Sequence, residues 1–95
     1  MFLTVALFLG CGPEADPVAG EEIYREACVT CHGEAGDLAV VINEVPAPVL
    51  ADIVPTLDDD TLVSAMVDGR GAMPPSGLSD DEAADCVAWL RVTFP

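Results

Sequence analysis

The residues best able to do chemistry are the two cysteines and the histidine of Cys28-Val29-Thr30-Cys31-His32. This C-x-x-C-H spacing is the one by which a c-type haem is attached. Two thiols can add to the two vinyl groups of one haem, and a histidine that follows at once can ligate the iron through a neutral imidazole nitrogen. The motif therefore predicts one covalent haem, held by Cys28, Cys31 and His32.

Other uses of the two cysteines have less support from the sequence. A structural zinc site takes four ligands, usually with a second Cys or His pair, whereas the chain has one histidine and no second C-x-x-C. A thioredoxin-like redox pair needs a βαβ setting, which the pattern does not show. A disulfide between the two cysteines, or a chance occurrence of the motif, stays open on the residues alone.

A second axial ligand for the iron has one good candidate among the three methionines. Met1 lies in the apolar N-terminal segment, and Met66 lies on the apolar face of an expected helix, where core packing explains it. Met73 lies in a non-helical segment, with Gly71 before it to let the backbone approach a flat ring and Pro74 after it to disfavour helix. Its thioether would favour ferrous iron and raise the reduction potential. The alternative is that Met73 only packs within its loop.

Three helices must position these residues. The first is expected to begin at Asp16-Pro17, an N-cap followed by the residue suited to the first helical position. Its apolar stripe has the spacing of one buried helix face, and consists of Gly20, Ile23, Tyr24, Ala27 and Cys28. The second helix spans residues 57–68 and ends at Gly69. The third opens with the capping box Ser79-Asp80-Asp81-Glu82.

The segments between these helices read as irregular. Residues 33–56 are expected to form a loop that wraps the haem, since Gly36, Pro46, Pro48 and Pro55 interrupt any periodicity there. Residues 70–75 are expected to be extended, because Met73 precedes a proline. With no strand pattern and no internal repeat, the predicted fold class is all-α.

The N-terminus reads as an export signal. Residues 1–10 are nearly all apolar and lead into Phe8-Leu9-Gly10-Cys11, which resembles a bacterial lipoprotein signal that is cut before the cysteine. We therefore expect acylation of Cys11, a flexible tether over residues 12–17, and a folded domain over residues 18–95. The alternative is an ordinary secretory signal with an incidental cysteine, since Phe8 stands where Leu is usual and no Lys or Arg precedes the apolar run.

Composition limits the partners. The 95 residues allow one small domain, and 17 acidic residues against three arginines and no lysine give a formal charge of −14. Such a charge argues against binding to nucleic acid or to anionic lipid. It predicts redox protein partners with a basic docking face, or else it serves solubility alone.

Three blocks of the sequence together resemble the small bacterial class I cytochromes c. The resemblance covers residues 16–94 and rests on Gly20-x-x-x-Tyr24-x-x-x-Cys28-x-x-Cys31-His32-Gly33, on Asp68-Gly69-Arg70-Gly71-Ala72-Met73-Pro74, and on Leu78-Ser79-Asp80-Asp81-Glu82 followed by Ala88-Trp89-Leu90. It implies the class I fold, in which three main helices and their loops wrap one covalent haem c. It also implies that His32 is the proximal ligand of the iron and Met73 the distal one.

The resemblance carries further expectations about packing. The first and last helices should cross, with Gly20 and Tyr24 against Trp89 and Leu90. The family uses a proline carbonyl to fix the proximal histidine, for which Pro48 fits best and Pro46 is a rival. Trp89 stands where the family often has tyrosine. Cys86 departs from the family pattern and is expected to be a small buried apolar residue, with a disulfide to a partner as the alternative.

These observations predict an exported one-electron carrier rather than an enzyme. With both axial positions filled by His32 and Met73, the iron has no site for a substrate. We expect a monomer in the periplasm, tethered to a membrane through Cys11. Two alternatives remain: an electron-entry subunit of a larger redox enzyme, and a gas-binding haem sensor if the methionine ligand is labile.

Overall fold

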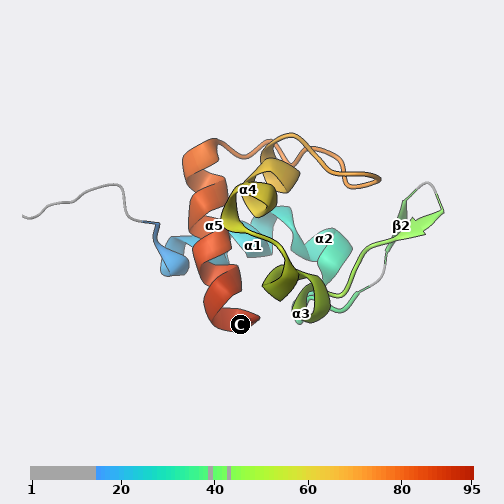
Figure 1. Cartoon of the computed structure of the whole chain (residues 1–95), viewed down its shortest axis with the longest axis horizontal. Coiled ribbons are helices and arrows are strands. Elements are labelled where there is room, and N and C mark those ends of the chain that lie inside the picture. The colour runs from blue at the N-terminus through green and yellow to red at the C-terminus, as the bar shows by residue number, and fades with distance from the viewer. Residues whose placement is uncertain (1–14, 39, 43) are drawn as a thin grey trace, which may run out of the picture.

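The computed structural model describes residues 15–38, 40–42 and 44–95, so Cys11 and most of the expected tether lie outside the described residues. Helices form most of this part of the chain (Figure 1). In chain order the elements are α1 (Pro17–Ala27), α2 (Val29–His32), β2 (Val41–Ile42), β3 (Val45–Pro46), α3 (Leu50–Ile53), the 3-10 helix η1 (Val54–Thr56), α4 (Asp59–Val67) and α5 (Asp80–Thr93). No helix in the described ranges is both long and apolar enough to cross a bilayer.

Helix α1 begins where its sequence predicts. The Asp16 side chain accepts a hydrogen bond from the Val18 N–H at 2.9 Å, and Pro17 occupies the first turn. These contacts satisfy a helix end whose first N–H groups have no partner within the helix. The Asp16 N–H also donates to the carboxylate of Asp85 in α5 at 2.8 Å. Asp16 is thereby bonded both to its own helix and to α5.

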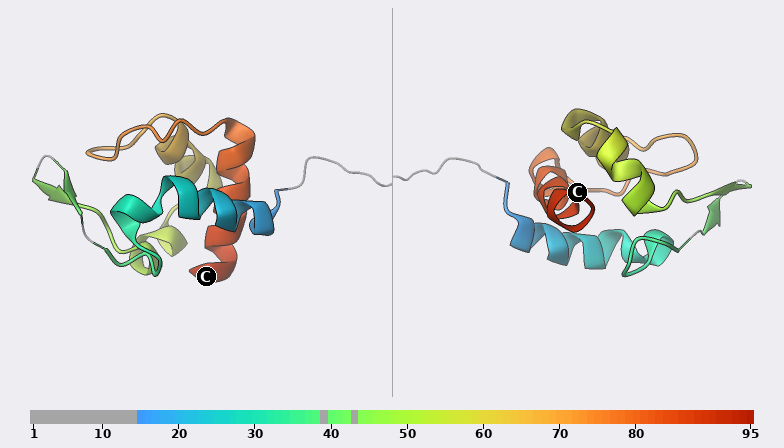
Figure 2. Two further views of the ribbon diagram at one scale, coloured as in Figure 1. Left: turned by 180° about the vertical axis from the view of Figure 1, so that it is seen from behind. Right: turned by 60° about the horizontal axis from the view of Figure 1, so that its bottom comes forward.

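The crossing of α1 and α5 organises the fold. In the right-hand view of Figure 2, α1 and α2 run along one side of α5, and α4 lies on the other. A Cβ atom on Gly20 would lie 1.9 Å from the carbonyl oxygen of Asp85, so only glycine permits this approach. The rings of Tyr24 and Trp89 stack with centroids 4.6 Å apart. The predicted crossing is correct, although Gly20 meets Asp85 and the next residue of α5 rather than Trp89.

Helices α4 and α5 are capped as their sequences predict. The Asp58 carboxylate accepts a hydrogen bond from the Thr61 N–H, so α4 begins two residues later than the predicted Leu57. Ser79 and Glu82 form the capping box of α5. The buried residues of the two helices are Leu62, Ala65 and Met66 in α4 and Ala83, Cys86, Val87 and Leu90 in α5.

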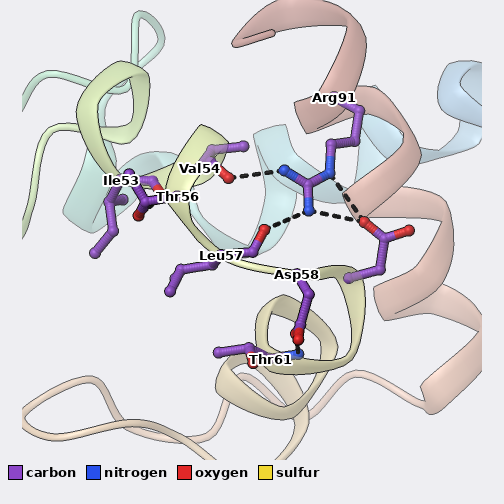
Figure 3. Close-up of polar contacts among 8 residues, drawn as sticks. Ile53, Val54, Thr56, Leu57, Asp58, Thr61 and Arg91 are labelled. Carbon is purple, nitrogen blue, oxygen red and sulfur yellow. Dashed lines mark hydrogen bonds and ion pairs between the residues drawn. The ribbon is translucent and has the colours of Figure 1, made fainter.

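Arg91 joins α5 to η1 and to the start of α4 (Figure 3). Its guanidinium donates to the carbonyl oxygens of Val54 and Leu57 at 2.7 and 2.5 Å, and to the carboxylate of Asp59 at 2.9 Å. A planar group with five N–H donors suits this task, because it satisfies several acceptors at fixed angles. One side chain of α5 thereby holds residues 54–59 in place.

The structure differs from three expectations about the connecting segments: a wholly irregular loop over residues 33–56, the absence of strands, and an extended segment over residues 70–75. Residues 33–56 are not wholly irregular: they hold α3, η1 and an antiparallel pair in which Val41 faces Pro46 and Ile42 faces Val45. A small sheet therefore accompanies the helices, and it projects from them beside α2 (Figure 1). Residues 70–73 are not extended but form a tight turn, in which Arg70 and Met73 exchange backbone hydrogen bonds of 3.0 and 2.9 Å.

Candidate functional site

Helix α2 brings the C-x-x-C-H residues to one cavity. Cys28 ends α1, with its N–H bonded to the carbonyl of Tyr24 at 2.9 Å, and its own carbonyl then accepts the N–H of His32 at 2.9 Å. Within this single turn Cys28, Cys31 and His32 all line the same cavity. The spacing predicted this arrangement, because residues three and four apart lie on one face of a helix.

The cavity has the size and polarity of a site for a large apolar cofactor. Its volume is about 520 Å³, within the usual range for small-molecule sites. Its walls come from the end of α1, α2, the hairpin, α3, η1, α4, the turn after α4 and Leu90 of α5. Although 17 residues of the protein are acidic, none of those that the structure describes lines the cavity. Apolar side chains and proline rings form most of the wall, including Val40, Ile42, Val45, Pro46, Pro48, Leu50, Ile53, Val54, Leu57 and Leu62.

His32 has the protonation state that a metal ligand needs. It is buried, and burial lowers the pKa of the imidazole below its usual value, so the ring is neutral at pH 7. The backbone carbonyl of Pro48 lies close to the ring and raises the pKa, which partly opposes the effect of burial. Nδ1 is nevertheless buried without a hydrogen bond of normal distance and angle. Of the two prolines considered from the sequence, Pro48 is thus the one whose carbonyl acts on His32.

The turn that carries Met73 is held firmly against α4. Gly69, at φ +88°, ends the helix, and a Cβ there would lie 2.7 Å from the Met73 carbonyl oxygen. After the turn, the N–H and the hydroxyl of Ser76 both donate to the carbonyl of Met66, at 2.9 and 2.6 Å. Met73 is partly buried and lines the same cavity as His32. The sequence reading missed Ser76, whose partner lies ten residues away.

Met66 lies in the core, as the sequence predicts, but it also reaches the cavity. Its exposed fraction is 6%, and it belongs to the buried face of α4. It lines the cavity wall alongside Met73. The two thioethers differ in their setting, because Met66 is part of a helix and Met73 is part of a turn.

Tyr24 fixes the chain immediately after the motif. Its hydroxyl donates to the carbonyl of Gly33 at 2.6 Å, and its side chain is 2% exposed. Burial raises the pKa of Tyr24 to about 12, with smaller contributions from Cys28, Cys86 and Asp37. The hydroxyl therefore stays protonated at neutral pH and can continue to donate.

Cys86 contacts the motif across the helix crossing. It is fully buried, as expected for a small apolar residue, and its thiol lies close enough to that of Cys28 for the two groups to perturb each other. The interaction between the two thiols lowers the pKa of Cys28 and, together with burial, raises the pKa of Cys86. Cys28, Cys31 and Cys86 are all free thiols, so the disulfide considered for the motif is not formed.

These residues fit a c-type haem better than a zinc ion. In the described part of the chain, no three His, Cys, Asp or Glu side chains lie together as a metal cluster. Two free thiols, a neutral imidazole and a thioether line one apolar cavity instead. They match the two thioether bonds and two axial ligands of a c-type haem.

Known proteins resemble the chain over most of its length. The family model described as cytochrome C oxidase, cbb3-type, subunit III matches residues 15–90. Cytochrome c-551 of Bacillus subtilis (strain 168) is 35% identical over 81 residues, which are 85% of this chain and 67% of that protein. The solved structure of cytochrome c6 from the diatom Phaeodactylum tricornutum superposes with a TM-score of 0.63 at 27% identity, and covers 84% of this chain and 95% of its own.

Proposed function

The chain belongs to the class I cytochromes c, small electron carriers with one covalent haem, and we propose that it is an exported one-electron carrier whose iron is held by His32 and Met73. In this proposal Cys28 and Cys31 form the two thioether bonds. The haem supplies the one-electron change between ferric and ferrous iron. The protein sets the potential of that change and exposes an edge of the cofactor to its partners.

The cavity wall carries this proposal. His32 on α2 and Met73 on the turn after α4 line one cavity, and both belong to segments held by backbone hydrogen bonds. A site closed by two protein ligands has no position for substrate, and this favours electron transfer over catalysis or gas binding. Neutral His32 can donate an imidazole lone pair, and the buried apolar wall excludes water from the iron.

The attachment chemistry is testable by mass. The intact protein, expressed with haem maturation factors and denatured in acid, should keep the mass of one haem. Cys28→Ala and Cys31→Ala should lower the haem yield, and His32→Ala should leave little folded holoprotein. Cys86→Ala is the matched control, since it removes a thiol that touches Cys28 but lies outside the motif, and it should keep the full haem mass. Haem that leaves the wild-type protein in acid would refute covalent attachment.

Export and anchoring form a second part of the proposal. The apolar run before Cys11 supports cleavage before this residue and its acylation, which would hold the domain in the periplasm at a membrane surface. Palmitate labelling of the wild type and of Cys11→Ala tests this. Label that depends on Cys11 supports the anchor, and equal label in both proteins refutes it.

One finding favours a second candidate function. The matching family model is described as a subunit of an oxidase, so the chain could act as the electron-entry subunit of a larger redox enzyme. Purification from the native membrane without cross-linking distinguishes the two. A carrier should separate from the oxidase in moderate salt, whereas a subunit should stay with it in constant stoichiometry.

A further inference from the structure

Exposed apolar side chains gather on and beside the β2–β3 hairpin. Of the large hydrophobic residues that the structure describes, six are exposed, and four of these lie between positions 38 and 49: Leu38, Val41, Val45 and Val49. The other two, Val18 in α1 and Val92 in α5, lie on separate helices. Single exposed apolar residues are ordinary, whereas apolar side chains grouped together mark contact surfaces.

The strand β2 has one face toward the cavity and one face away from it. Val40 and Ile42 line the cavity, whereas Val41 between them does not line it and is 61% exposed. Successive side chains of a strand point to opposite faces, so Val41 points away from the cavity. A cofactor in the cavity therefore leaves Val41 exposed, and only a molecule outside the protein can cover it.

The backbone of the hairpin is tied to the site. The N–H of Leu38 donates to the carbonyl of His32 at 3.0 Å, and the N–H of Ala47 donates to the carbonyl of Val40 at 2.9 Å. At the turn, Glu44 has a φ of +66°, a conformation that residues other than glycine seldom adopt and that is enriched at functional sites. The hairpin thus presents a carboxylate between its two strands, and its base is one hydrogen bond from the backbone of His32.

The charges in the segment that contains the hairpin are all negative. No Lys or Arg occurs between Arg25 and Arg70, whereas the exposed acidic residues of positions 33–56 are Glu34, Asp37, Glu44 and Asp52. A second copy of the chain, with its formal charge of −14, would be repelled from this surface, and so would anionic lipid. An apolar groove with Lys and Arg on its rim is complementary to it both in polarity and in charge.

We propose that the β2–β3 hairpin, with Leu38 and Val49 beside it, is the surface on which a redox partner docks, and that this partner receives the hairpin in an apolar groove rimmed by lysine and arginine. The inference rests on the proposed function, because it requires a partner that exchanges electrons with the site. Helix α1 begins at the opposite end of the molecule from the hairpin (Figure 1), so a tether at the N-terminus leaves the hairpin free. A partner docked there lies against the strand whose other face forms the cavity wall.

Oxidation of the reduced, haem-loaded protein by membranes of its source organism, prepared from a strain without this chain, tests the inference. Val41→Thr keeps the branched shape but brings a hydroxyl into the contact, so KM should rise about fivefold at nearly constant kcat. Val18→Thr and Val92→Thr are the matched controls, because these valines are 77% and 69% exposed away from the hairpin, and both should keep the wild-type KM. Glu44→Gln should raise KM at low salt and match the wild type at high salt.

Three results would overturn the inference. The first is a KM of Val41→Thr equal to that of the wild type and the two control variants. The second is a wild-type dimer in sedimentation equilibrium that Val41→Thr dissociates, and the third is binding to phosphatidylcholine vesicles that Val41→Thr abolishes, since the hairpin would then meet a second copy or a lipid surface.

Oxidation by a small uncharged redox reagent separates this failure from a wider one. A chain that holds no haem, or whose reduced form does not react with the reagent, refutes the proposed function as well. Normal reaction with the reagent, together with equal KM values for all variants on the membranes, refutes the docking surface alone.

Discussion

At the scale of single residues, the two methionines at the cavity make the sharpest comparison. Met73→Ala should abolish the weak far-red absorption band of a methionine–ferric iron bond and lower the reduction potential, because the soft thioether that favours ferrous iron is gone. Met66→Ala should keep the band and cost about 2–5 kcal/mol of stability, as expected for a buried methionine. Loss of the band in Met66→Ala, and its retention in Met73→Ala, would mean that Met66 is the iron ligand and Met73 is not.

Tyr24 predicts a loss of stability at high pH. The folded pKa of about 12 exceeds the ordinary value of 10, so the contribution of the neutral hydroxyl is complete below pH 10 and disappears as the pH rises toward 12. The unfolding free energy should fall by roughly 1–2 kcal/mol over this range. No other tyrosine and no lysine titrates in this range, because the chain has one tyrosine and no lysine. Cys86, whose pKa is also raised, loses its own contribution to stability above its ordinary pKa.

Comparison with Tyr24→Phe separates the two groups. Urea unfolding from pH 9 to 12 should show a smaller decline in the variant, because only Cys86 still contributes to it. The variant should also be less stable at pH 7, since the hydrogen bond to Gly33 is absent. Identical slopes for the two proteins would contradict the assigned role of the hydroxyl.

What the sequence predicts at this scale depends on how local the signal is. Cys28, Cys31 and His32 lie within one turn, so their spacing already indicates their common direction. The contacts of Arg70, Cys86 and Ser76 could not be predicted in this way, because each depends on residues brought close by tertiary structure.

At the scale of helices and strands, the α1–α5 crossing predicts a strict requirement at position 20. Gly20→Ala should lower the unfolding free energy by about 1–3 kcal/mol, although alanine gains about 1 kcal/mol in helix propensity. The reason is the 1.9 Å approach of the new Cβ to the Asp85 carbonyl oxygen. Val18→Ala in the same helix is the control, because Val18 is 77% exposed and the change should be nearly neutral. Equal stability of both variants in thermal unfolding would mean that the helices can separate without cost.

The accuracy of the sequence prediction also differs between elements. The capped helices were predicted within two residues, because Asp16, Asp58 and Ser79 supply local hydrogen bonds that mark helix starts. The turn at Arg70–Met73 was missed, since its two bonds form between backbone atoms and leave no side-chain signature. The hairpin was missed because each strand has only two residues, too few for an alternating pattern.

At the scale of the whole molecule, the charge of −14 predicts how the protein meets its partners. Electron transfer to a partner with a basic docking face should slow as salt rises, because exposed charges are screened beyond about 8–10 Å at physiological ionic strength. Stopped-flow rates across a salt series measure this. The control is a small uncharged redox reagent, whose rate should change little. Equal salt dependence for both reactants would show that the acidic residues serve solubility alone.

The central claim is that protein side chains occupy both axial positions of the iron. Carbon monoxide binds ferrous haem only where one position is open or readily vacated, so it tests the claim without any variant. The wild-type protein, reduced at neutral pH and mixed with carbon monoxide, should give almost no change in its absorbance spectrum. Rapid and complete formation of a carbon monoxide complex would contradict closed His32–Met73 ligation, and the protein would then be a gas-binding haem protein rather than an electron carrier.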